Sequence, residues 1–83
     1  MSVKQLPPLT LLLHEEKLSD GSPIWVATCP ELDVTTQGFS IKHAQEMLRE
    51  AIEGVLDVAS DAEIEQRLAD GYTPTIEPLK WAA

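Results

Sequence analysis

Residues 40–60 read SIKHAQEMLREAIEGVLDVAS, and this stretch decides the fold. Its apolar residues recur at spacings of three and four, the period that gathers side chains on one face of an α-helix. A helix with one apolar face must bury that face against another element. The sequence therefore predicts a long amphipathic helix from Ile41 to Ala59. The residues of its apolar face are Ile41, Ala44, Leu48, Ala51, Ile52, Val55 and Ala59.

Three positions set the local structure of this helix. Ser40 is the predicted N-cap, because its hydroxyl can accept a hydrogen bond from a backbone N–H of the first turn. His43 stands where a capping box requires Glu or Gln, so the full box is predicted to be missing. Gly54 costs about 1 kcal/mol relative to alanine inside a helix, which favours a close approach of another backbone. A tolerated surface glycine is the alternative.

The residues before the helix predict a three-stranded antiparallel meander. Leu9 to Glu16 is read as the first strand, and residues 17–23 contain Asp-Gly and a proline, which are typical of a reversing loop. Ile24 to Thr28 is rich in β-branched and aromatic residues, as strands are. Pro30 should end this strand, and Val34 to Gln37 supplies the third.

The residues after the long helix predict a second, shorter one. Ser60 and Glu63 have the spacing of a capping box and Gly71 is a good terminator, so residues 61–70 should be helical. Residues 75–81 have strand-like composition interrupted by Pro78, so they would pair only at a sheet edge. The prediction is a single α+β domain over residues 1–83, with its core at 9–59, a short helix at 61–70 and a C-terminal segment at 72–83.

Bulk properties limit the kinds of partner. The 83 residues suffice for one domain, and the formal charge of −8 opposes the phosphate neutralisation on which nucleic-acid binding depends. Direct DNA or RNA binding is therefore not expected, whereas encounter with a small basic protein would be accelerated. The sequence has no apolar run long enough to cross a bilayer, no signal-peptide pattern and one cysteine, so we expect a cytoplasmic protein.

No arrangement of reactive side chains indicates an enzyme, a cofactor site or a metal site. His14 and His43 lie on different elements, and nothing at ligand spacing accompanies them. Cys29 has no positive neighbour to stabilise a thiolate and is read as a small residue packed at a strand end. Trp25 is read as core or near-core. A metal-dependent nuclease is the lowest-ranked hypothesis. Three of the five carboxylates that it would need fall on the polar helix face, where solvation explains them. The five are Glu31, Asp33, Glu46, Glu50 and Glu53.

Three motifs in order resemble the core pattern of HicB-like antitoxins. They are WVATCPEL at 25–32, TQGFS at 36–40, and Ala44 followed by Glu-Ala-Ile at 50–52. The motif residues that carry over are Trp25, Ala27, Pro30, Glu31, Leu32, Gly38, Ser40, Ala44 and Ala51. The resemblance implies a partial RNase H-like fold without catalysis. It also implies neutralisation of a small basic HicA-like toxin that cleaves mRNA. Residues 60–83 are too few for the helix-turn-helix domain that many members add.

The expected function is therefore an antitoxin-type binding module that occludes its toxin. The alternative is a stand-alone structural or regulatory interaction protein that has the same fold and no toxin partner. The candidate partner-binding residues are the carboxylates of the polar helix face, although the same residues would also simply keep the helix soluble; they are Glu46, Glu50, Glu53 and Asp57. Open meander edges and the proline-containing C-terminal segment are natural places for strand addition between chains, so a homo-oligomer is also predicted.

Overall fold

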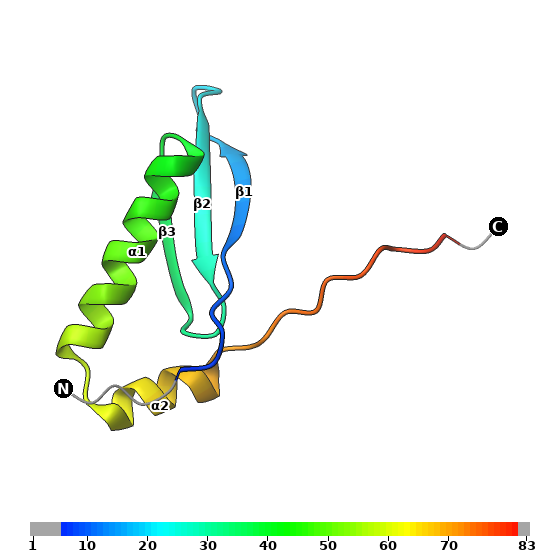
Figure 1. Ribbon diagram of the computed structural model, residues 1–83. Helices are drawn as coiled ribbons and strands as arrows, with labels where there is room; N and C mark the ends of the chain where they lie inside the picture. The colour runs from blue at the N-terminus through cyan, green and yellow to red at the C-terminus, as the bar shows by residue number, and fades with distance from the viewer. Residues whose placement is uncertain (1–5, 82–83) are drawn as a thin grey trace.

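Three strands form an antiparallel sheet in the computed structural model, which describes residues 6–81 (Figure 1). They are β1 (Leu12–Lys17), β2 (Pro23–Cys29) and β3 (Val34–Gly38), in the order β1-β2-β3. The predicted meander is confirmed, although β1 begins three residues later than the sequence pattern indicated. The polar leader, residues 1–5, lies outside the described residues.

The turn between β1 and β2 sets the register of the hairpin. Gly21 has a φ of 88°, a conformation that suits glycine, and its N–H donates to the Leu18 carbonyl over 2.8 Å. The Ser22 N–H donates to the Asp20 carboxylate over 2.9 Å, and hydrogen bonds from Ser22 lower the pKa of Asp20. The turn thereby brings Lys17 opposite Pro23 and aligns the rest of the pair.

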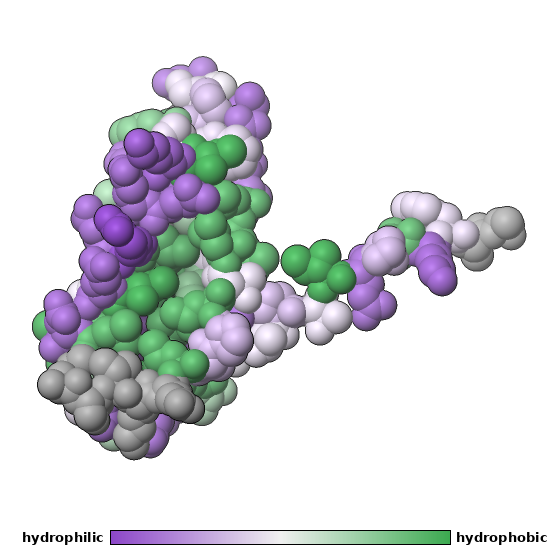
Figure 2. Space-filling model, in the orientation of Figure 1, coloured by the Kyte–Doolittle hydropathy of each residue, from purple (hydrophilic) through white to green (hydrophobic). Residues whose placement is uncertain are grey.

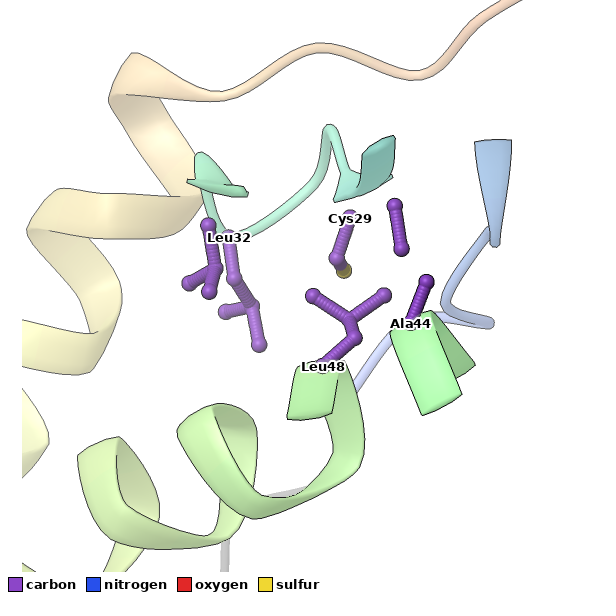
Figure 3. Close-up of a cluster of buried hydrophobic side chains, with 6 residues drawn as sticks. Cys29, Leu32, Ala44 and Leu48 are labelled. Carbon is purple, nitrogen blue, oxygen red and sulfur yellow. The ribbon is translucent and has the colours of Figure 1, made fainter. Parts of the chain in front are cut away.

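One face of the sheet is covered by α1 (Ile41–Val58), which packs on β3 and β2. Hydrophilic residues follow the outer side of this helix, and hydrophobic residues fill the space between helix and sheet (Figure 2). Ala44 and Leu48 point from α1 towards Cys29 of β2 (Figure 3). The predicted amphipathic helix is confirmed, and the core cluster consists of Ala27, Cys29, Leu32, Val34, Ala44 and Leu48.

Both helices begin at serine caps. The Ser40 hydroxyl accepts from the His43 N–H over 3.0 Å, which confirms the predicted N-cap. The side chain of His43 also takes part, because its Nδ1 accepts from the Phe39 N–H over 3.0 Å. The full capping box is missing from α1, as the sequence predicted, and the imidazole accepts instead from the residue before the cap. The second helix, α2 (Asp61–Asp70), has the complete capping box between Ser60 and Glu63 that the sequence predicted.

The C-terminal segment leaves the body of the domain. Residues 72–81 form no strand and extend away from α2 (Figure 1), so the edge strand predicted for residues 75–81 does not form. Two prolines, Pro74 and Pro78, deprive the segment of backbone donors that a sheet edge would use. The radius of gyration of 15.3 Å exceeds the roughly 12 Å expected for a compact domain of this length, as an extended segment requires.

Close backbone contacts occur at two glycines, and neither of them is Gly54. A Cβ added at Gly38 would lie 2.4 Å from the backbone nitrogen of Ala44, where α1 crosses β3. A Cβ at Gly71 would lie 2.2 Å from the carbonyl oxygen of Glu31. Around Gly54 nothing lies within 4 Å, so the predicted close approach there is wrong. Gly54 is instead exposed on the outer side of the helix.

This difference predicts opposite effects for one substitution at two glycines. We expect Gly54→Ala to raise the free energy of unfolding by up to about 1 kcal/mol, because the site is open and alanine favours the helix. Gly38→Ala should lower it by about 1–3 kcal/mol, because backbone must move to admit the methyl group. Urea unfolding followed by circular dichroism measures both. Stabilisation at both positions would show that α1 lies further from β3.

The core predicts a graded response along α1. Leu48 is 4% exposed and Ile52 is half-buried, so Leu48→Ala should cost about 2–5 kcal/mol and Ile52→Ala should cost less. Met47, which neighbours Leu48 but is 37% exposed, provides the control, and Met47→Ala should change stability by no more than about 0.5 kcal/mol. Thermal or urea unfolding of the three variants checks the order. Equal losses at positions 47 and 48 would contradict the orientation of the helix.

Candidate functional site

Four carboxylates form a stripe on the outer side of α1, and we call these residues the acidic stripe. Glu46, Glu50, Glu53 and Asp57 are spaced by four, three and four residues and are all exposed. At about 100° per residue they fall within an arc of about 60°. The same construction places Ala44, Leu48, Ala51 and Val55 on the opposite side, which faces the sheet. The stripe therefore points away from the core over about three turns.

The acidic stripe is available for contact with another molecule. Within residues 6–81, no hydrogen bond or ion pair engages its carboxylates. Two cations, Lys42 and Arg49, flank it on one side. The charges also run against the helix dipole, since the first turn of α1 contains no acidic residue and the last turn no basic one. Such a surface suits a basic partner better than an anionic one.

The residues that carry the HicB-like resemblance mostly build the scaffold beneath this surface. Ala27, Pro30, Leu32 and Ala44 are fully buried. Gly38 admits α1 to the sheet, Ser40 caps it, and Trp25 and Ala51 pack against the core cluster. The structure thus brings the motif residues together in one unit of strand, turn, strand and helix. These motif residues make structural contacts and lie away from the acidic stripe.

The remaining motif residue, Glu31, is a buried carboxylate in the turn between β2 and β3. It is 4% exposed and accepts hydrogen bonds from the Thr10 hydroxyl, at 2.6 Å, and the Thr10 N–H, at 2.8 Å. Burial acts to raise the pKa of Glu31, but the hydrogen bonds from Thr10 outweigh burial, so the pKa is lowered. The charged carboxylate therefore fastens the segment before β1 to the core.

Backbone groups of the same turn hold two further segments. The Pro30 carbonyl accepts from the N–H of Tyr72 at 3.0 Å, and the Leu32 carbonyl accepts from Arg67 Nη1 at 3.3 Å. The turn closes through Asp33, whose φ is 57°. Residues 30–32 thus connect the N-terminal segment, α2 and the start of the C-terminal segment. Sequence reasoning missed this role, because no local pattern pairs Thr10 with a residue 21 positions away.

Cys29 and the two histidines have structural surroundings. Cys29 is fully buried, and burial raises the pKa of its thiol, which disfavours the nucleophilic thiolate. His14 pairs with Glu16 on exposed β1 at 2.7 Å, whereas His43 contributes to the start of α1. No group of three or more His, Cys, Asp or Glu that could hold a metal ion occurs in the part of the chain that the structure describes. The five carboxylates of the nuclease reading are thus not brought together as a metal site among residues 6–81.

Hollows on the surface of the described residues include a polar one and an apolar one. The polar one, of about 300 Å³, is lined by Asp33, Glu63, Gln66, Arg67 and Asp70, whose charges partly offset each other. The apolar one, of about 350 Å³, lies between α1 and the chain leading into β1. Neither encloses a group of residues capable of nucleophilic or acid–base chemistry. Among residues 6–81, no helix combines the length and the apolar character needed to cross a membrane.

The comparisons add no relative. The chain matches no known family model, and neither a curated protein nor a solved structure is significantly similar to it. The HicB-like resemblance therefore depends on the motif residues alone.

The lowered pKa of Glu31 predicts acid sensitivity. Above the ordinary glutamate pKa of about 4.3, the charged carboxylate should contribute fully to stability, and this contribution should vanish as pH falls through the lower folded-state value. We expect Glu31→Gln to lose about 1–3 kcal/mol at pH 7, because Gln replaces a charged acceptor with a neutral amide. The loss should shrink in acid. Urea unfolding between pH 7 and pH 3 measures it, and Glu15→Gln on exposed β1 is the control. A pH-independent loss at Glu31 would contradict the charged hydrogen bonds.

Proposed function

We propose that this domain is a HicB-like antitoxin-type module that binds a small basic HicA-like toxin and occludes its RNA-binding surface. The observation that carries the proposal is the acidic stripe, a row of exposed carboxylates opposite the packed face of α1. The motif resemblance supplies the class of partner. The proposed action is occlusion without covalent chemistry.

The charge balance supports a protein partner over a nucleic acid. A toxin that cleaves RNA needs a cationic surface to hold phosphates, and the same surface attracts a chain of formal charge −8. The acidic stripe presents part of that charge along one straight element. It can therefore compete for the surface that RNA would otherwise occupy. The chain itself would bind no RNA in this scheme.

The arrangement also separates folding from binding. The four stripe residues point away from the core cluster, so a change among them alters the contact surface and leaves the packing of α1 on the sheet in place. A binding module of this kind can vary its partner while its scaffold stays constant. That separation makes the proposal testable by substitution.

The test uses any small basic protein that is found encoded beside the gene for this chain. We expect Glu46→Lys, Glu50→Lys and Glu53→Lys together to slow association at least about tenfold at low salt, with a smaller effect at high salt. Stopped-flow mixing measures the rate, and an RNA-cleavage assay measures the protection. Protection of RNA by the wild-type chain should weaken in the triple variant.

A control separates the stripe from net charge. Glu15→Lys, Glu16→Lys and Asp61→Lys change the formal charge equally but lie on β1 and at the start of α2. This variant should associate faster than the stripe variant. Equal slowing of association in both triple variants would show that net charge, and not a defined surface, controls the rate. If the wild-type chain neither binds the neighbouring protein nor protects RNA, the antitoxin proposal fails and the stand-alone alternative is favoured.

A further inference from the structure

The C-terminal segment, residues 72–81, exposes apolar side chains that a monomer leaves in water. The exposed fractions are 58% for Tyr72, 80% for Ile76, 72% for Leu79 and 85% for Trp81. Single exposed apolar residues are ordinary on protein surfaces. Four exposed apolar residues within ten consecutive positions, two of them aromatic, are typical of a segment that binds to another protein surface.

The same chain offers an apolar groove that nothing in residues 6–81 fills. Leu9 and Leu11 form one side of it, and Leu48 and Ile52 of α1 form the other, around a volume of about 350 Å³. Figure 2 shows hydrophobic residues in this region between α1 and the strands. Thr10, Gln45, Arg49 and Glu53 complete the lining. The groove is thus apolar in its middle and charged at its rim.

We propose that the C-terminal segment of one copy lies in the apolar groove of a second copy, and that reciprocal exchange gives a symmetric dimer. The charges fit this occupant. The groove carries one cation and one anion, Arg49 and Glu53, and the segment carries Glu77 and Lys80. The rim therefore offers one opposite charge for each charge of the segment. Among the stripe residues only Glu53 lines the groove, so the dimer would leave Glu46, Glu50 and Asp57 open to a basic partner.

The geometry of the segment favours a second copy over a return to its own groove. Its start is fixed, because Gly71 packs on the Glu31 carbonyl and the Tyr72 N–H donates to Pro30. Beyond that point, Pro74 and Pro78 hold the residues before them in extended conformations. No glycine, asparagine or aspartate between 72 and 81 favours a reversal. The chain accordingly continues away from the domain (Figure 1).

The area that such an exchange covers is enough for a stable interface. Aromatic side chains bury about 150–250 Å² each, and Tyr72 and Trp81 are 58% and 85% exposed, so two copies of each contribute on the order of 400–700 Å². The aliphatic residues of the segment and the covered grooves add to this. The total reaches the roughly 1,200–2,000 Å² of a standard protein interface. A monomer would gain none of it.

The tryptophans provide a direct test on the full chain. The sequence contains two, and Trp25→Phe leaves Trp81 as the only one. We expect the emission of Trp81 in this variant to shift to shorter wavelength as concentration rises, with a molar mass by light scattering that approaches twice 9.1 kDa. The wild-type chain should show the same mass change, so the test survives if Trp25→Phe weakens folding.

Substitutions on each surface identify the contact. Leu79→Ser in the segment and Leu11→Ser in the groove should each raise the dimer dissociation constant at least about tenfold while circular dichroism stays unchanged. Val58→Ser, on α1 outside the groove and 84% exposed, is the control and should have no effect. A blue-shifted emission in a monomer at all concentrations would mean that the segment folds back on its own chain. Fold-back of this kind would overturn the proposal. So would a monomer in which Trp81 is fully exposed, or a dimer whose dissociation constant is insensitive to both substitutions.

Discussion

The carboxylate of Glu31, charged and buried in the turn between β2 and β3, organises the ends of this small domain. Its two hydrogen bonds to Thr10 secure the chain before β1, while backbone carbonyls of the same turn receive Arg67 and Tyr72. A buried charge without partners would be costly, so Glu31 stabilises the fold because Thr10, with the Cys29 thiol at 3.7 Å, satisfies it. One turn thereby connects the N-terminal segment, α2 and the C-terminal segment, whereas a larger domain has a larger core to hold its segments together.

The two sides of the long helix α1 differ, since one packs on the sheet and the other exposes the surface proposed for recognition. One side supplies Ala44 and Leu48 to the core, where small residues let the helix approach β3 at Gly38. The other side carries the acidic stripe and has no contact with the sheet. Because the residues of the HicB-like pattern lie mainly on the packed side, the resemblance describes a scaffold. The proposed recognition would depend on exposed positions, of which the pattern includes only Glu50.

The sequence predicted those features that depend on local chemistry. The period of α1, the hydroxyl caps at Ser40 and Ser60 and the loop before β2 each need only nearby residues, and the structure confirms them. Features set by distant partners were missed or misplaced. The close backbone contacts lie at Gly38 and Gly71 rather than Gly54, since what a glycine meets depends on another element. The role of Glu31 depends on Thr10 in the same way. The acidic stripe followed from helical spacing alone, but spacing cannot identify a partner.

The unfavourable charge order along α1 has a thermodynamic consequence. Asp57 stands in the last turn, where the helix already presents partial negative charge, and no basic residue there offsets it. A cation from a bound molecule would relieve this repulsion, so the free energy of binding would include a gain in helix stability. Any ligand that prefers the folded chain raises its apparent stability by mass action. The unbound chain would consequently open more often at the end of α1 and offer proteases an entry point that the complex withholds.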